Sequence, residues 1–244
     1  MGAAGGRHRL KCTTEFSTGA RPEGLGKTAV ACFRHGMALE NGFSYSFWAR
    51  GLAGARGERW LFDGLDINLG PGEVLVVTGP NGTGKTTLLR ILAGLLPAAE
   101  GQVGWEPAPD DGEVALHYLG HQNSVKGALT VAQNLAFWQR LSGVRDGAAV
   151  AAAQTIFALE DLVDLPARVL SAGQQRRLAL ARLVAIPAPL WLLDEPTTAL
   201  DAGSAAAFAR AVAAHRDAGG MAILATHQDL GFEPTFRLDM GVVS

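Results

Sequence analysis

Residues 74–96 read VLVVTGPNGTGKTTLLRILAGLL, and this stretch decides the fold class of the chain. It begins with the apolar run VLVVT, which follows a Pro71-Gly72 turn and is typical of a buried strand. A glycine-rich segment comes next, and the run from Lys85 repeats its apolar residues at helical spacing until Pro97. A strand, a glycine loop and a helix in this order predict an α/β protein.

The glycine loop fits a phosphate-binding pattern, G-x-x-x-x-G-K-[ST], at every defined position of Gly79–Thr86. Glycines let backbone N–H groups turn toward a phosphate chain, and the following helix adds its positive N-terminus. Lys85 would reach the outer phosphates and Thr86 would hold magnesium. A second Gly-Lys-Thr at 26–28 has Arg21 in place of the first glycine and no strand before it, so we discard it. The candidate nucleotide-binding residues are Gly79, Pro80, Asn81, Gly82, Thr83, Gly84, Lys85, Thr86 and Thr87.

Two carboxylates end the apolar run LWLLDE at 190–195. This run, MAILATH at 221–227 and VALHYLGHQ at 114–122 suit parallel strands, while FSYSFW at 43–48 and LDINL at 65–69 also read as strands. Because ligands bind at the carboxyl ends of parallel strands, Asp194 would take magnesium and Glu195 would accept a proton from the attacking water. The plainer alternative is a strand-end pair that caps a loop.

Composition bounds the class of protein. With 244 residues, 48% apolar and 18% charged, the chain holds one large domain, or a domain with a subdomain, and a real core. The net charge of -2 does not favour nucleic acid or anionic lipid, and no uncharged stretch reaches the roughly 18 residues of a membrane span. Two cysteines, both before residue 37, indicate a reducing compartment rather than a disulfide framework.

The first 36 residues have no helical or alternating periodicity, and we expect a disordered extension or a mis-assigned start. Met37 would then be the true start, and the domain would comprise residues 37–244. A basic, acid-poor transit peptide is the alternative.

LSAGQQRR at 170–177 predicts a helix start with Ser171 as its cap and with Gly173 leaving room for an anion. The phosphate loop, this segment and the carboxylate pair, in this order, resemble the nucleotide-binding subunit of ABC transporters. Gln122, Ala199-Leu200-Asp201 and His227 fall where that family has its glutamine loop, D-loop and switch histidine. The resemblance covers residues 48–240 and implies a RecA-like core, an antiparallel β subdomain and a helical subdomain at about 123–180.

The same resemblance assigns roles to the residues. It implies ATP and Mg²⁺ as ligands, with Glu195, His227 and Gln122 catalytic and with Thr86, Gln122 and Asp194 around the metal. The signature residues would contact a nucleotide bound by a second copy of the chain, and they are Ser171, Ala172, Gly173 and Gln174. The adenine-stacking aromatic of many relatives falls on Arg56, whose guanidinium can stack on a base, and Trp60 is a weaker candidate.

A narrower resemblance is to the haem exporter ATPases of bacterial cytochrome c maturation. GHQNSVKGALTVAQNL at 120–135, the LSAGQ form of the signature, LLDEPTTALD at 192–201 and THQ at 226–228 carry it, although Gln133 replaces a usual glutamate. It implies ATP hydrolysis coupled to haem export, integral-membrane partner subunits, and a peripheral place on the cytoplasmic face of the bacterial inner membrane. Alternatives are the ATPase of another small exporter, a soluble ABC ATPase of DNA repair or translation, and a regulatory module without turnover.

Overall fold

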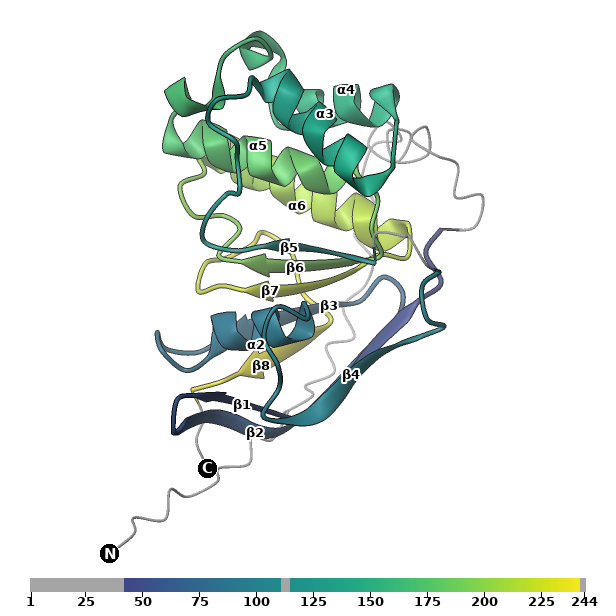
Figure 1. The fold of residues 1–244 in the computed structure, drawn as a ribbon, viewed down its shortest axis with the longest axis vertical. Helices are drawn as coiled ribbons and strands as arrows, with labels where there is room; N and C mark the ends of the chain where they lie inside the picture. Colours follow the sequence, from purple (N-terminus) through teal and green to yellow (C-terminus); the bar gives the residue numbers. More distant parts are fainter. Residues whose placement is uncertain (1–41, 111–114, 242–244) are drawn as a thin grey trace, which may run out of the picture.

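The computed structural model describes residues 42–110 and 115–241, which form two sheets and the helices around them (Figure 1). The larger sheet has five parallel strands in the order β5-β6-β7-β3-β8. Their bounds are β3 Val74–Thr78, β5 Leu116–Leu119, β6 Leu190–Asp194, β7 Met221–Ala225 and β8 Phe236–Asp239. The predicted α/β class and the parallel strands are therefore confirmed.

The central strands are continuous apolar runs because helices cover both faces of this sheet. All five residues of β6 and all five of β7 are buried. On one face, Trp191 and Leu193 pack in a core with residues of helices α5 (Ala172–Ala185) and α6 (Ala202–Asp217). On the other face, Leu190 and Leu192 pack with helix α2 (Lys85–Leu92).

The smaller sheet is antiparallel, in the order β2-β1-β4, with β1 Ser46–Arg56, β2 Arg59–Leu69 and β4 Glu100–Glu106. Phe47, Leu52 and Leu69 of this sheet share the core that surrounds α2, so α2 packs between the two sheets. The strand expected at 43–48 begins at Ser46 and continues to Arg56, where a two-residue turn starts the hairpin to β2. This sheet is the β subdomain that the family resemblance implies.

Helix α2 ends at Leu92, so the prediction that it continues to Pro97 is wrong. Gly94 has a φ of 69°, a left-handed conformation that glycine adopts without steric cost and that ends helices. The N–H of Gly94 bonds to the carbonyl of Ile91, and that of Leu95 bonds to Arg90. Leu95 and Leu96 are exposed as a result, although their spacing fits the helix.

The helices between β5 and β6 lie at the end of the molecule farthest from the antiparallel sheet (Figure 1). They are α3 Val131–Ser142, α4 Gly147–Ile156, the 3₁₀ turns Glu160–Leu162 and Ala167–Val169, and α5. Gln133 forms a capping box at the start of α3, in which its Oε1 accepts from Thr130 N at 3.0 Å. Glutamate and glutamine both suit this third helical position, so the departure at Gln133 leaves the cap intact.

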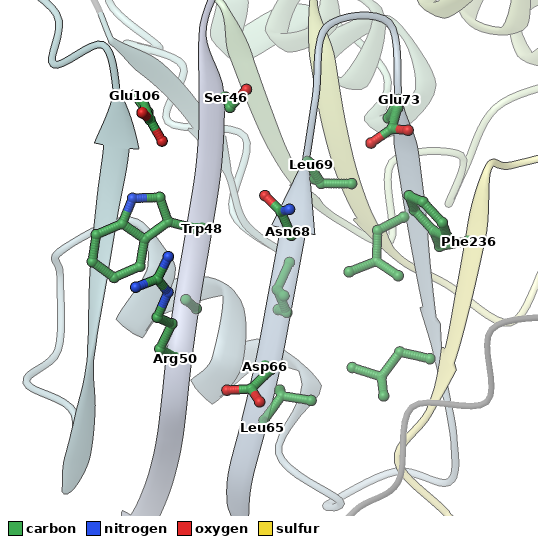
Figure 2. A pocket seen from close by; sticks show the side chains of 14 residues that line it. Ser46, Trp48, Arg50, Leu65, Asp66, Asn68, Leu69, Glu73, Glu106 and Phe236 are labelled. Carbon is green, nitrogen blue, oxygen red and sulfur yellow. The ribbon is translucent and has the colours of Figure 1, made fainter.

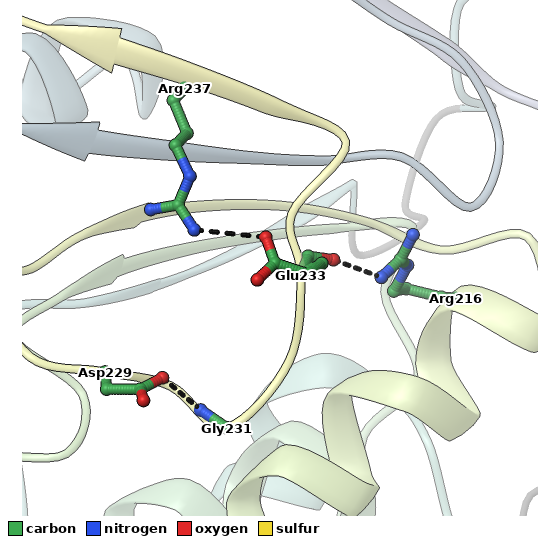
Figure 3. Close-up of polar contacts among 5 residues, drawn as sticks. All are labelled: Arg216, Asp229, Gly231, Glu233 and Arg237. Atoms are coloured by element: carbon green, nitrogen blue, oxygen red, sulfur yellow. Dashed lines mark hydrogen bonds and ion pairs between the residues drawn. The ribbon is translucent and has the colours of Figure 1, made fainter. Parts of the chain in front are cut away.

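The segment between β7 and β8 is held to the rest of the chain by polar contacts (Figure 3). Arg216, at the end of α6, donates to the carbonyl of Gly72 at 3.0 Å and to that of Glu233 at 3.1 Å. Glu233 pairs with Arg237 at 3.3 Å, and Asp229 accepts from Gly231 N at 2.9 Å. These contacts fix the segment that leads into the edge strand β8.

The expected extension 1–36, with its two cysteines, and Met37 lie outside the described residues. None of the helices in residues 42–110 and 115–241 is both long and apolar enough to span a membrane.

Candidate nucleotide-binding and hydrolytic site

A pocket of about 680 Å³ lies at the carboxyl ends of β3 and β6, against the turn of the β1–β2 hairpin. The phosphate loop, the start of α2, the carboxylate pair and the hairpin all contribute to it. Its lining includes Arg56, Asn81, Gly82, Gly84, Lys85, Thr86, Thr87, His121, Asp194 and Glu195. Residues that the sequence places more than 100 positions apart thus share one pocket.

The phosphate loop has the backbone of an anion site. Gly84 is the N-cap of α2 with a φ of 107°, and it offers no side chain to the first helical N–H groups. A Cβ at Gly84 would lie 3.0 Å from the Cβ of Leu61, so both the conformation and the space require glycine. The helix N-terminus therefore presents free donors and a positive dipole end to the pocket.

Lys85 is nearly buried and is held by its own loop. Its Nζ donates to the carbonyls of Gly79 and Pro80, the latter at 3.0 Å. It also lies 2.9 Å from His227 Nε2, which must be the acceptor because an ammonium group has only donors. The structure therefore brings the predicted switch histidine to the phosphate-loop lysine.

Thr86 and Asp194, two of the residues predicted to lie around magnesium, are hydrogen-bonded to each other. The hydroxyl of Thr86 donates to Asp194 Oδ2 at 2.7 Å, across 108 residues of sequence. Asp194 is the last residue of β6 and is buried. A hydroxyl and a carboxylate are the hard oxygen ligands that Mg²⁺ takes, so this pair fits the metal.

Glu195 follows Asp194 with a φ of 48°, a left-handed conformation that is uncommon outside glycine. Its N–H bonds to the carbonyl of Ala225 at 2.8 Å. Its carboxylate accepts from the Thr226 hydroxyl at 3.1 Å, and Thr226 is buried. Sequence reasoning missed Thr226, although it directly precedes His227 in the THQ motif.

Arg176 is a second residue that sequence reasoning missed. It lies on α5 and is 4% exposed, and each of its five N–H donors has an acceptor. Burial lowers the pKa of Arg176 to about 10, while the charges of Asp194 and Glu195 raise it. It therefore remains a cation at neutral pH. The acceptors are the carbonyls of Gly120, Asp194, Glu195 and Pro196 and the amide oxygen of Asn123, at 2.7 to 3.1 Å.

The pocket lining differs from the prediction at Gln122. Gln122 is exposed and is not among the lining residues, whereas its neighbour His121 is. Both residues lie in a bend of the loop that follows β5, so the path of this loop decides which of them faces the pocket. Of the two candidates for the adenine, Arg56 lines the pocket and Trp60 does not.

The signature and D-loop residues are outside the pocket lining of this chain. Ser171 caps α5, as predicted, in a capping box with Gln174. Asp201 caps α6 by accepting from Ser204 N at 2.7 Å, and this hydrogen bond lowers the pKa of Asp201. A Cβ at Gly173 would lie 2.8 Å from the carbonyl of Ala199, so this glycine lets the D-loop approach α5.

A second hollow lies where the two sheets meet, between β1, β2, β3 and β8 (Figure 2). Two of its carboxylates already accept backbone donors, Asp66 from Gly51 N and Glu73 from Gly70 N, each at 2.7 Å. Arg50 stacks on Trp48, with its guanidinium carbon 4.8 Å from the ring centroid. These groups stabilise turns and strands, and none belongs to the motifs that the sequence singled out.

Comparisons with known proteins show which family this chain resembles. The sequence pattern of the ABC transporter family matches residues 62–198. The cytochrome c biogenesis ATP-binding export protein CcmA of Rhizobium meliloti (strain 1021) is 50% identical over 199 residues, which cover 79% of this chain and 96% of that protein. CcmA of Paracoccus denitrificans (strain Pd 1222) is 49% identical over 192 residues, covering 79% of this chain and 87% of its own length.

Solved structures share the fold. An ABC transporter ATP-binding protein from Pyrococcus furiosus matches with a TM-score of 0.70 at 22% identity, over 80% of this chain and 97% of its own. A nucleotide-free ATP-binding cassette from an ABC transporter matches with a TM-score of 0.62 at 20% identity, over 75% of this chain and 82% of its own. On the family match and on identities near one half over most of both chains, this protein belongs to the ABC transporter family.

Proposed function

We propose that this chain is the ATP-binding and ATP-hydrolysing subunit of an ABC exporter that serves cytochrome c biogenesis, with haem as its cargo. The observation that carries the hydrolytic role is the convergence of Lys85, the Thr86–Asp194 pair and Glu195 on one pocket. The names of the relatives that are about 50% identical support the export role. Another small exporter, or a soluble ABC ATPase, remains the alternative that the experiments below separate.

The phosphate loop and the N-terminus of α2 bind the triphosphate of ATP through backbone N–H groups. Lys85 supplies positive charge to the outer phosphates, and its neighbour His227 reaches the same place because the two side chains are 2.9 Å apart. Arg56 borders the pocket on the hairpin side, where its planar guanidinium suits a base.

Thr86 and Asp194 are the residues that would hold Mg²⁺, and Gln122 would join them only after its loop turns. When bound, Mg²⁺ neutralises the negative charge that develops on the β- and γ-phosphate oxygens. Glu195 lies one residue beyond Asp194 on the pocket wall and accepts the proton of the attacking water.

A second copy of the chain completes each site. The signature residues Ser171–Gln174 lie outside this chain's own pocket, so they are available to a nucleotide held by another copy. Gln122 and the segment to Leu135 would meet integral-membrane partners, which places the subunit peripherally on the cytoplasmic face of the bacterial inner membrane.

Substitutions of Glu195 and Lys85 test the hydrolytic role. Glu195→Gln keeps the shape and loses the proton acceptor, so we expect ATP binding to persist while turnover falls by about 10²-fold or more. Lys85→Ala removes a charge from the phosphate site, so it should weaken binding itself. Turnover and equilibrium binding of a fluorescent ATP analogue are the two measurements. Wild-type turnover in the Glu195→Gln protein would reject Glu195 as the base.

The export role is tested by purification from detergent-solubilised membranes. We expect integral-membrane subunits of the cytochrome c maturation system to co-purify with the chain, and haem-stained c-type cytochromes to be lost in cells that carry Glu195→Gln. Co-purification with membrane subunits of another exporter, with cytochromes intact, would reject haem export but retain the ATPase.

A further inference from the structure

Arg176 is a buried cation that donates its hydrogen bonds to carbonyl and amide oxygens and not to the neighbouring carboxylates. It lies on α5, five positions after the signature serine, and the pocket lining does not include it. Its N–H groups donate to four main-chain carbonyls and one side-chain amide, although the charges of Asp194 and Glu195 are close enough to raise its pKa. Its contacts therefore hold backbone in place.

The acceptors belong to two segments that separate at the end of the parallel sheet. Strands β5 and β6 pair as far as Leu119 and Leu193. One residue further on, the carbonyls of Gly120 and Asp194 both accept hydrogen bonds from Arg176, at 3.1 and 2.9 Å. The guanidinium thus joins the two segments where their own ladder stops, and it ties both to α5.

One of these segments contains the strained residue of the site. Glu195 has a φ of 48°, and such a conformation persists only when the surrounding structure imposes it. Arg176 donates to the carbonyls of Glu195 itself, at 2.7 Å, and of both its chain neighbours. The direction of the Glu195 side chain therefore depends on these three bonds.

The other segment carries Gln122. Arg176 donates to Gly120 O at 3.1 Å and to Asn123 Oδ1 at 2.9 Å. In the sequence these two residues lie on either side of the exposed Gln122. Nη1 makes both of these bonds, whereas Nη2 and Nε of the same guanidinium donate to the carbonyls of Asp194, Glu195 and Pro196, so a shift of this loop acts on the group that holds Glu195. Loop and carboxylate are thus linked through one rigid, planar group.

We propose that Arg176 is a positioning residue that holds Glu195 in its hydrolytic orientation and couples it to the loop that carries Gln122. This inference rests on the proposed ATP hydrolysis by Glu195. It assigns Arg176 no contact with ATP, so its loss should act on turnover and spare nucleotide binding.

Arg176→Lys is the sharpest variant, because it keeps the charge but has three donors on a point-like group in place of five in a plane. We expect kcat for ATP to fall by about tenfold to a hundredfold, as for a catalytic group displaced by about 1 Å. The KM and the affinity for a fluorescent ATP analogue should stay within about threefold of the wild type.

Arg182→Lys is the matched control. Arg182 is on the same helix and is largely buried, and it donates to a carbonyl of β5, that of Tyr118 at 2.8 Å, but to neither carboxylate segment. Its replacement removes a hydrogen bond to β5, so it should lower the melting temperature, but it should leave kcat unchanged. Equal losses of kcat in the two variants would overturn the proposal in favour of a general role in stability.

Asn123→Ala tests the coupling and also serves if Arg176→Lys does not fold. It removes one acceptor, so we expect a smaller fall in kcat, and the double variant should lose no more than Arg176→Lys alone, within about twofold. Wild-type kcat in Asn123→Ala, or losses that multiply in the double variant, would overturn the coupling.

The outcomes for the proposed function and for Arg176 are distinct. If Glu195→Gln abolishes turnover while Arg176→Lys leaves kcat at the wild-type value, only the role of Arg176 fails. If the wild type and Glu195→Gln hydrolyse ATP equally, the hydrolytic assignment fails and the role of Arg176 fails with it.

Discussion

Single residues of this site depend on partners that are distant in sequence. Glu195 is fixed by a buried hydroxyl, Thr226 Oγ1 at 3.1 Å, as well as by its backbone contacts. The same hydroxyl accepts from Gln228 N at 3.1 Å, so Thr226 connects the carboxylate to the loop of the switch histidine. A short side chain of this kind orients a catalytic group without touching the substrate.

Thr226→Val replaces the hydroxyl with a methyl group of similar size. Because the carboxylate of Glu195 and the N–H of Gln228 each lose a partner, we expect kcat to fall by about tenfold and stability to fall by about 1–3 kcal/mol. Steady-state ATPase and urea unfolding measure the two effects. Thr226→Ser retains the hydroxyl and should restore most of kcat. A Val variant with normal kcat would contradict the role of the hydroxyl.

At the scale of elements, the segment that follows β5 is folded onto helix α3. Asn134 of α3 is fully buried and binds both backbone groups of Lys126, accepting from its N–H at 2.9 Å and donating to its carbonyl at 3.1 Å. The Lys126 ammonium lies 4.5 Å from the centroid of the Phe137 ring, while its side chain is exposed. The conformation of this segment thus depends on Asn134, and the charge of Lys126 is free to meet a partner.

Lys126→Glu should leave nucleotide binding unchanged and reduce stability only by the lost cation–π contact, about 0.5–1 kcal/mol. If the segment binds a membrane partner, charge reversal should also reduce recovery of the subunit with membranes and the formation of c-type cytochromes. Membrane fractionation and haem staining provide the readouts, with Lys126→Gln as a control that removes charge without reversing it. Normal membrane recovery together with normal cytochromes would indicate a merely solvated lysine.

At the scale of the whole molecule, two buried histidines make folding sensitive to acid. His215 stacks on Trp191 at 3.9 Å and donates to the carbonyl of Met221 at 3.1 Å, and His117 donates to that of Ile186 at 2.8 Å. Burial lowers the pKa of His117 to about 4 and that of His215 to about 3. The unfolded chain therefore binds more protons than the folded protein below the ordinary histidine pKa of about 6.5.

Stability should thus be highest above pH 6.5 and should fall progressively below it, by on the order of 2 kcal/mol for each histidine at pH 5. Urea unfolding at pH 7.5 and pH 5.0 measures the loss. His215→Gln keeps a donor for Met221 but does not titrate, so it should remove about half of the pH dependence.

The N-terminal extension is the second prediction at this scale. A chain that starts at Met37 should keep the melting temperature and ATPase of the full chain, because residues 1–36 have no periodic apolar face. Calorimetry of the two proteins measures the difference. A loss of more than about 4 °C would show that the extension contributes about 1 kcal/mol or more.

The sequence by itself determined the features that lie within short stretches of chain. The β3–loop–α2 unit, the buried runs of β6 and β7 and the cap at Ser171 follow from apolar period, glycine spacing and hydrogen bonds that span three or four residues. The order of the motifs also identified the family. The predicted length of α2 was wrong because Gly94 ends the helix through its backbone conformation, which apolar spacing does not reveal.

Only the tertiary structure decided which side chains meet at the end of the sheet. Arg176 bonds to residues 18 to 56 positions away, and Thr226 to one 31 positions away, so no local pattern distinguishes them from an ordinary arginine or threonine. That His121 lines the pocket and Gln122 does not depends likewise on the path of the loop that follows β5. Such contacts arise because parallel strands bring distant segments to one edge, where packing rather than propensity selects the neighbours.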